Sequence, residues 1–225
     1  MLRALGLHKT FRAPDGRAIQ VLNGVNLAVE RGEHVAIVGR SGSGKSTLLN
    51  LLGCLDRSDA GELWFGDVLL SRARRRTLAR FRGRQLGFVF QTFNLIPSLT
   101  AMENVLLAAR YVGRDRADAT RAAGELFERL AIAERTGHYP PALSGGEQQR
   151  VAFCRAVLND PAVILADEPT GNLDEENAAI ILYELRERAK GGGSAVVLVT
   201  HNPELARAAD RVLHLEAGRL VAVRP

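Results

Sequence analysis

The sequence contains no apolar run long enough to cross a membrane. Its apolar stretches all fall short of the roughly 20 residues that a transmembrane helix needs. The first residues, MLRALGLHKTF, also lack the long apolar core of a signal peptide. We therefore expect no direct insertion into a membrane, so that any role at a membrane would require a partner protein.

Cysteine is scarce, with two residues among 225. Cys54 and Cys154 lie in apolar helical patterns, without paired spacing and without neighbouring histidines. We interpret both as reduced core residues. This interpretation argues against a disulfide framework and a cysteine metal site, and it fits a cytosolic compartment.

Acidic residues are slightly outnumbered, with 25 against 30 basic ones, which gives a net charge of +5. The excess is local, because seven arginines fall within thirteen residues: Arg72, Arg74, Arg75, Arg76, Arg80, Arg82 and Arg84. A solvated helix face is the simplest interpretation, and contact with lipid headgroups, a partner or nucleic acid is the alternative. Otherwise the composition, 46% hydrophobic and 24% charged, is typical of a globular protein.

Strand and helix patterns alternate along the chain. The first third predicts strands over residues 2–11, 19–29 and 33–38. A glycine-rich loop then leads into a helix with a predicted core face of Leu48, Leu51, Leu52 and Leu55. Residues 100–140 have helical spacing, and Thr100 and Glu103 form a capping box at the start.

The last third returns to strand–helix alternation. It predicts a strand over residues 162–167, a helix over 175–190 and a strand over 195–200. Such alternation predicts a parallel sheet with helices packed on it. No repeat or long linker marks a second independent domain.

A phosphate-binding loop follows the third predicted strand, with the sequence GRSGSGKS. Phosphates require close backbone approach and inward N–H groups, which Gly39, Gly42 and Gly44 permit. Lys45 would then lie against the β- and γ-phosphates, and the Ser46 hydroxyl would bind Mg²⁺. The predicted nucleotide-binding set is Gly39, Arg40, Ser41, Gly42, Ser43, Gly44, Lys45, Ser46 and Thr47.

An acidic pair ends the buried strand of the sequence VILADEPT. A carboxylate emerging from a strand beside a phosphate-binding loop suits Mg²⁺, which assigns Asp167 to the metal. Glu168 follows where the chain turns, so that its carboxylate can face the γ-phosphate and polarise an attacking water. The pair therefore predicts hydrolysis as well as binding.

The stretch LSGGEQQR begins a helix with Ser144 and Glu147 as a capping box. Two glycines follow the cap although each costs roughly 1 kcal/mol against Ala in a helix interior. Between the phosphate-binding loop and the acidic strand, this stretch resembles the signature motif of the ATP-binding cassette (ABC) ATPases. The resemblance implies a homodimer in the ATP-bound state, in which this helix start points at the γ-phosphate held by the partner chain.

The resemblance also implies roles for single residues. Ser144, Gly145, Gly146 and Glu147 would contact the partner's ATP, and Asp174 would lie in the loop at the dimer interface. Gln91 matches a residue that touches Mg²⁺ or the attacking water. His201 matches the histidine that contacts the γ-phosphate and orients Glu168. Phe11 stands where the family often stacks adenine on a tyrosine, and simple core packing is the alternative for this residue.

The implied fold is α/β, with a parallel-rich P-loop core, an antiparallel β-subdomain at the N-terminus and an inserted helical subdomain. A single domain would cover residues 1–225: about 1–90 for the β-subdomain and loop, 91–145 for the helices, and 146–225 for the rest of the core. The implied ligands are ATP and Mg²⁺.

The stretches LLGCLDRSDAGEL, FQTFNLIPSLTAMENV and ILADEPTGNLD resemble the macrolide-exporter and lipoprotein-releasing group. This implies an ATPase at the cytoplasmic face of a bacterial inner membrane, acting on a separate permease-like subunit. Candidates for contact with that subunit are Phe93, Leu95, Ile96 and Leu99, for which internal packing is the alternative. Extracytoplasmic signalling without transport is a second functional hypothesis. A nucleic-acid role is not expected, because long coiled-coil insertions and a second cassette are absent from the sequence.

Overall fold

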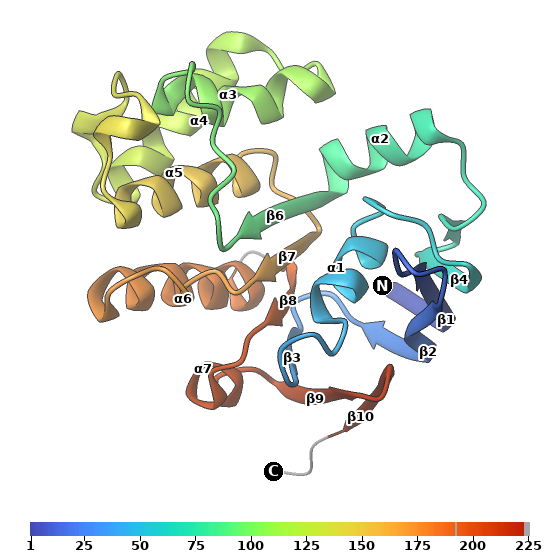
Figure 1. Cartoon of the computed structure of the whole chain (residues 1–225). Helices are drawn as coiled ribbons and strands as arrows, with labels where there is room; N and C mark the ends of the chain where they lie inside the picture. The colour runs from blue at the N-terminus through green and yellow to red at the C-terminus, as the bar shows by residue number, and fades with distance from the viewer. Residues whose placement is uncertain (192, 223–225) are drawn as a thin grey trace.

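Two β-sheets and a set of helices form the fold in the computed structural model, which describes residues 1–191 and 193–222 (Figure 1). The N-terminal part forms an antiparallel sheet of four strands in the order β2–β1–β4–β5. Its strands are β1 (Leu2–Arg12), β2 (Ala18–Val29), β4 (Ala60–Phe65) and β5 (Val68–Leu69). The predicted strands over 2–11 and 19–29 are confirmed and pair as a hairpin.

A six-stranded sheet forms the centre of the molecule, in the order β10–β9–β3–β8–β7–β6. Neighbours from β9 to β6 are parallel, and β10 is antiparallel to β9. Parallel strands end at one edge, so the loops that follow β3, β6, β7 and β8 gather there. The strands are β3 (His34–Val38), β6 (Leu86–Phe90), β7 (Val163–Asp167), β8 (Ala195–Val199), β9 (Arg211–Glu216) and β10 (Arg219–Ala222).

Helices pack on this central sheet and on one another. They are α1 (Lys45–Leu52), α2 (Arg75–Gln85), α3 (Ala101–Val112), α4 (Arg116–Arg129), α5 (Gly145–Val157), α6 (Glu175–Lys190) and α7 (Pro203–Arg207), with short 3₁₀ turns at Ala133–Arg135 and Pro140–Ala142. In Figure 1, α3, α4 and α5 lie together on one side of β6. The predicted helical region is confirmed, including its capping box between Thr100 and Glu103.

Apolar side chains fill two cores. One lies between α1, the antiparallel sheet and one face of the central sheet, and the other lies under α3, α4, α5 and α6. Cys54 and Cys154 are buried, one in each core, and both are free thiols, as predicted. The α/β architecture expected from the sequence is therefore present. The central sheet combines β3 and β6, from the first 90 residues, with β7 and β8 from the later part of the chain.

The prediction that Leu55 belongs to the core face of the first helix is wrong. The helix α1 ends at Leu52, Gly53 forms its C-cap, and Cys54 has a left-handed backbone with φ of 53°. The helical period therefore stops before Leu55, whose side chain is 49% exposed. Leu48, Leu51 and Leu52 are buried as predicted.

Within the described residues, none of the helices has the length and apolar composition that a membrane span requires.

Candidate nucleotide-binding site

The loop between β3 and α1 depends on glycine for its shape. A Cβ atom at Gly39 would lie 2.6 Å from the Leu215 carbonyl oxygen and 2.9 Å from Ser43 Oγ. Gly42 and Gly44 have left-handed φ values of 75° and 100°, and a Cβ at Gly44 would lie 2.7 Å from Val21. Such backbone favours glycine, so this loop keeps its form only with these residues.

The side chain of Lys45 folds back over this loop. Its ammonium group donates to the carbonyl oxygens of Gly39, at 2.9 Å, and of Arg40, at 3.1 Å. Ser43 Oγ is buried in the same loop without a hydrogen-bond partner. A positive ammonium, a free hydroxyl and the N-terminus of α1 thus converge, which is a suitable cradle for phosphate.

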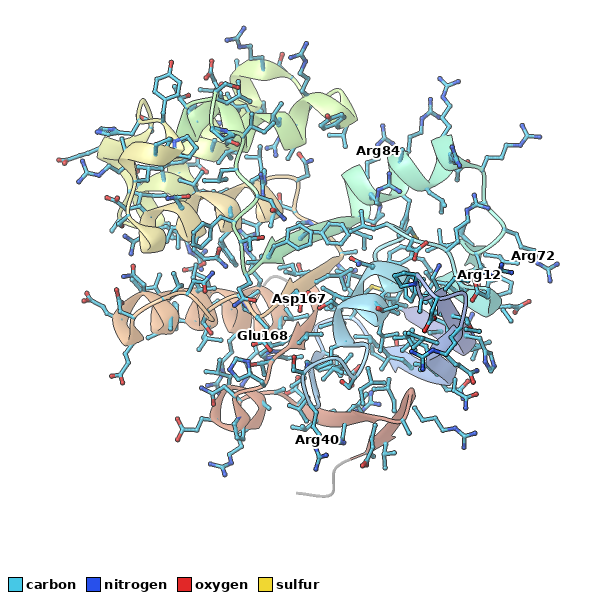
Figure 2. All side chains as sticks on the ribbon, in the orientation of Figure 1. Arg12, Arg40, Arg72, Arg84, Asp167 and Glu168 are labelled. Carbon is cyan, nitrogen blue, oxygen red and sulfur yellow. The ribbon has the colours of Figure 1, made fainter. Side chains whose placement is uncertain are left out.

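The other predicted loop residues surround this cradle. Arg40, Ser41 and Ser46 are exposed, and Thr47 is half-buried on α1. Figure 2 shows Arg40 apart from the acidic pair Asp167 and Glu168.

Asp167 ends β7 beside the start of α1. Burial raises the pKa of this carboxyl, and a hydrogen bond with the Ser46 side chain opposes the rise. A carboxylate and a hydroxyl in contact are hard oxygen donors of the kind that Mg²⁺ prefers. The two residues therefore fit a magnesium ion.

Glu168 lies where the chain turns out of β7. Its φ is 46°, in the left-handed region, and its N–H donates to the Val199 carbonyl at 2.9 Å. The carboxylate Oε1 lies 2.9 Å from His201 Nδ1, with the His201 ring much more exposed than Glu168. The structure thus brings Asp167 and Glu168, at the end of β7, together with His201, which follows β8, at the carboxyl edge of the central sheet.

Gln91 follows β6 at the same edge. A Cβ at Gly171, in the loop after Glu168, would lie 2.9 Å from Gln91 Nε2, and Asn172 Nδ2 donates to the Gln91 carbonyl at 3.0 Å. The side chain of Gln91 therefore lies against the segment that follows the acidic pair. Phe11 is elsewhere, on β1 of the antiparallel sheet, where its ring is 43% exposed and Lys9 Nζ lies 5.2 Å from the ring centroid.

The helix α5 begins with the capping box that the sequence predicts. The Glu147 N–H donates to Ser144 Oγ at 3.3 Å, and the Ser144 N–H donates to Glu147 Oε2 at 2.8 Å. The Arg135 guanidinium, 2.6 Å from Glu147 Oε1, lowers the pKa of that carboxyl. The helix start is thus held firmly despite its two glycines.

Those two glycines have different surroundings. A Cβ at Gly145 would approach nothing closer than 3.8 Å, whereas a Cβ at Gly146 would lie 2.2 Å from Asn177 Oδ1. Asn177 in turn accepts from Arg150 Nη1 at 2.7 Å and donates to Asp174, the N-cap of α6. Packing within the chain therefore explains glycine at 146 and leaves glycine at 145 without a steric reason.

The residues at 144–147 stay apart from the phosphate-binding loop. In the part of the chain that the structure describes, no hydrogen bond or ion pair joins residues 144–147 to residues 39–47. The loop with its acidic pair and the start of α5 are therefore two separate features of one chain.

Two polar residues, one buried and one half-buried, were not identified from the sequence. Gln149 is fully buried in α5 and donates to the carbonyls of Pro169, at 2.5 Å, and Phe90, at 3.3 Å. It thereby ties the segment after Glu168 to the end of β6, just before Gln91. Asn177 joins α5 to the N-terminus of α6. A polar residue in the apolar period of α5 was the available signal for Gln149.

Comparisons with known proteins agree on one family. The family described as ABC transporter matches residues 22–171. The chain is 46% identical to the lipoprotein-releasing system ATP-binding protein LolD of Saccharophagus degradans, over 90% of this chain and 89% of that protein. It is 44% identical to the macrolide export ATP-binding/permease protein MacB of Agrobacterium fabrum, over 99% of this chain and 34% of that protein.

A solved structure gives the same result. The dimeric structure of a post-hydrolysis state of the ATP-binding cassette MJ0796, bound to ADP and Pi, superimposes with a TM-score of 0.92. It shares 38% sequence identity with this chain, and the alignment covers 100% of both chains.

Proposed function

Because this chain belongs to the ABC transporter family, we propose that it is the ATP-hydrolysing subunit that drives a separate membrane permease. It is an ABC-type ATPase, and the finer proposal concerns the process it drives: export, lipoprotein release or transmission of motion across the membrane. The observation that carries the proposal is the phosphate cradle of Lys45 beside the Glu168–His201 pair, in a chain similar to LolD along 90% of its length.

ATP binding falls to the loop and the start of α1. The Lys45 ammonium would exchange its present carbonyl acceptors for the β- and γ-phosphate oxygens, since a charged acceptor makes the stronger hydrogen bond. The exposed Phe11 ring offers a face for adenine. Ser46, Asp167 and Gln91 would hold Mg²⁺, which when bound neutralises charge between the β- and γ-phosphates.

Hydrolysis falls to Glu168. Its carboxylate would accept a hydrogen bond from the attacking water, and His201, 2.9 Å away, would keep the carboxylate oriented. Gln91 lies against the loop after Glu168. A change in this loop when nucleotide binds or is hydrolysed would therefore move Gln91 and, through it, the helices that follow β6.

A complete site would need two chains. We assign Ser144, Gly145, Gly146 and Glu147 to the ATP held by a second copy, and Asp174 to the interface, because these residues make no bond to their own phosphate-binding loop. Contacts to the γ-phosphate from both chains favour the closed dimer, and loss of that phosphate releases it. The helices at 91–145 would move with this closure as part of one ATP-binding domain spanning residues 1–225.

The permease contact is assigned to the segment between β6 and α3. Phe93, Leu95 and Leu99 are half-buried and Ile96 is 42% exposed, so internal packing accounts for only part of this apolar set. Arg155 donates to the carbonyls of Phe93 and Asn94, at 2.8 and 2.6 Å, which holds the segment on α5. Such a contact would place the chain at the cytoplasmic face of a bacterial inner membrane as a peripheral subunit.

The test is affinity purification of the Glu168→Gln variant with MgATP from detergent-solubilised membranes, followed by mass identification of bound proteins. We expect a membrane protein with few spans and a large extracytoplasmic domain. The control is Lys45→Ala, which should lose most nucleotide binding and therefore recover less of that protein. Nucleic acid or ribosomes in place of a membrane protein would overturn the membrane role and leave the ATPase chemistry standing.

A further inference from the structure

The arginine run of the sequence forms one exposed surface on and before α2. We call this surface the arginine face and define it by its exposed members: Arg72, Arg74, Arg75, Arg76, Arg80 and Arg84. Arg72 and Arg84 mark its two ends in Figure 2. Arg76, Arg80 and Arg84 are four residues apart, so they form a single row along the helix.

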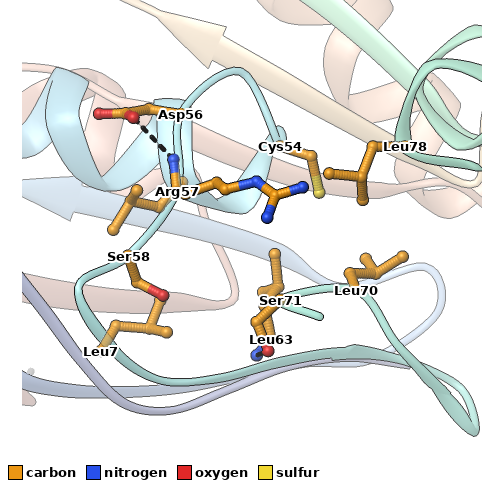
Figure 3. Close-up of a pocket in the computed structure, with 10 residues that line it drawn as sticks. Leu7, Cys54, Asp56, Arg57, Ser58, Leu63, Leu70, Ser71 and Leu78 are labelled. Atoms are coloured by element: carbon orange, nitrogen blue, oxygen red, sulfur yellow. Dashed lines mark hydrogen bonds between the residues drawn. The ribbon is translucent and has the colours of Figure 1, made fainter. Parts of the chain in front are cut away.

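The opposite side of α2 anchors the helix to the protein. Leu78 points toward Cys54 in a small pocket shared with Leu63 and Leu70 (Figure 3). The Phe81 ring packs edge-on against Phe65, at a centroid distance of 4.9 Å. The seventh arginine of the run, Arg82, donates to the Cys54 carbonyl at 2.9 Å. The arginine face is thus held outward on a fixed helix.

Charge on this face is almost uncompensated. Between Asp67 and Glu103 the sequence has no acidic residue. Among the described residues, the face makes one ion pair, from Arg72 to Glu62 at a long 3.8 Å, and none of its guanidinium groups donates a hydrogen bond. Asp160, which lines a surface pocket with Arg84, is already paired with Arg188 at 3.0 Å.

The first turn of α2 is destabilised by this arrangement, and within the arginine face only Arg84, in the last turn, complements the helix dipole. Arg75 and Arg76 occupy the first turn of α2, where no acidic residue and no side-chain cap are present. Positive charge there opposes the helix dipole, and like charges four residues apart repel one another. A sequence that serves only the stability of α2 would place these charges differently, so an external anionic partner is the physical reason that fits.

We propose that the arginine face binds an anionic phospholipid surface. An exposed row of charges along a helix matches the flat array of headgroup phosphates, and arginine pairs with phosphate through two parallel hydrogen bonds. Nucleic acid fits less well, because the aromatic side chain of α2, Phe81, is packed on Phe65 and is not free to stack on a base.

The position of α2 agrees with this partner. A Cβ at Gly83 would lie 3.0 Å from Val112 Cγ1, so α2 packs closely on α3. In Figure 1, α2 leads directly into β6, and α3 follows the segment 93–99 assigned to the permease. The inference rests on the proposed membrane role, because contact with the permease would turn α2 toward the membrane. Lipid contact would then strengthen the attachment of the chain to the membrane beyond what the permease provides.

The test uses the purified full chain without permease and vesicles of two compositions, phosphatidylcholine alone and phosphatidylcholine mixed with phosphatidylglycerol. Co-sedimentation should show binding to the anionic vesicles only, weakened as salt rises toward about 0.15 M. The variant Arg76→Gln/Arg80→Gln/Arg84→Gln should bind about 100-fold more weakly, at roughly fivefold per arginine.

A matched control removes the same charge elsewhere. The variant Arg116→Gln/Arg121→Gln/Arg219→Gln changes three exposed arginines outside the arginine face and should bind vesicles as the wild type does. Equal losses in both variants, equal binding to neutral vesicles, or binding to polyglutamate or DNA in preference to anionic vesicles would each overturn the proposal. Thermal unfolding and ATP hydrolysis should be unchanged in both variants. Recovery of the permease with Glu168→Gln tests the proposed membrane role separately from vesicle binding.

Discussion

At the scale of single residues, the pair of Glu168 and His201 gives the sharpest prediction. We expect His201→Ala to lower the hydrolysis rate about 100-fold, because Glu168 loses the partner that lies 2.9 Å from its carboxylate. ATP affinity should change much less, since Lys45 and the loop remain intact. Phosphate release and nucleotide titration measure the two quantities. His214→Ala, on β9, is the control, and full activity in the His201 variant would refute the positioning role.

Cys54 gives a prediction about alkaline stability. Burial raises the pKa of its thiol from 9.0 to about 11. Between these values the unfolded chain loses the Cys54 proton while the folded chain keeps it, so rising pH favours unfolding. The contribution is fully present below pH 9 and should fall by about 2 kcal/mol by pH 11.

Chemical denaturation across this pH range measures the effect. The free energy of unfolding of Cys54→Ala should be lower than that of the wild type below pH 9 and should decline less steeply above pH 9. Parallel curves for the two proteins would contradict the assignment. Cys154, whose pKa burial also raises, is present in both proteins and cancels in the comparison.

The positions of candidate site residues were predictable where the pattern is local. The loop glycines, Lys45 and the acidic pair follow from sequence order, because a strand end fixes where each side chain emerges. Gln149 was not predictable, since its acceptors on Pro169 and Phe90 come from segments 20 and 59 residues away. The only local signal is a polar residue in the apolar period of α5, and it does not identify the distant carbonyls.

At the scale of elements, the two glycines at the start of α5 allow the effect of a substitution on packing to be distinguished from its effect on hydrolysis. We expect Gly145→Ala to leave thermal stability unchanged or slightly higher, because its Cβ meets no atom within 3.8 Å and alanine favours helix. The same change should lower hydrolysis on the order of 100-fold, since the methyl group would stand between the helix start and the partner's phosphate. Calorimetry and phosphate release measure the two effects.

Gly146→Ala is the matched comparison. Its Cβ would lie 2.2 Å from Asn177 Oδ1, so the variant should lose about 1–3 kcal/mol of stability as Asn177 leaves its bonds to Arg150 and Asp174. Both stability and activity should therefore fall. Normal hydrolysis by Gly145→Ala would contradict the proposal that residue 145 approaches the phosphate held by a second chain.

Elements with local end signals were predicted well. The caps at Thr100 and Ser144 are confirmed, because side-chain oxygens and backbone N–H groups within four residues define them. The end of α1 was missed, since apolar leucines continue past Gly53 while the left-handed Cys54 breaks the helix. The strand β6 was also not identified, because a short apolar run does not distinguish strand from helix until β7 pairs with it.

At the scale of the whole molecule, one chain carries the two parts of the proposed composite site without a direct bond between them. The phosphate cradle lies at the carboxyl edge of the central sheet, and the exposed Ser144 begins a separate helix that its capping box holds in place. Two-fold pairing would bring each part to the other, because an isologous interface places the same surfaces of two copies opposite one another. Such pairing would explain why residue 145 is glycine, which packing within a single chain does not explain.

Assembly of the chain should therefore depend on the bound nucleotide. We expect Glu168→Gln to elute as a dimer with MgATP and as a monomer with MgADP, because γ-phosphate contacts from both chains persist when hydrolysis is blocked. Size-exclusion chromatography with light scattering measures the mass. Lys45→Ala should remain monomeric because it lacks bound ATP, and Gly145→Ala in the Glu168→Gln background should remain monomeric although ATP is bound. A dimer in all four cases would show that the interface forms without the phosphate, and a monomer in all four would remove the start of α5 from the mechanism.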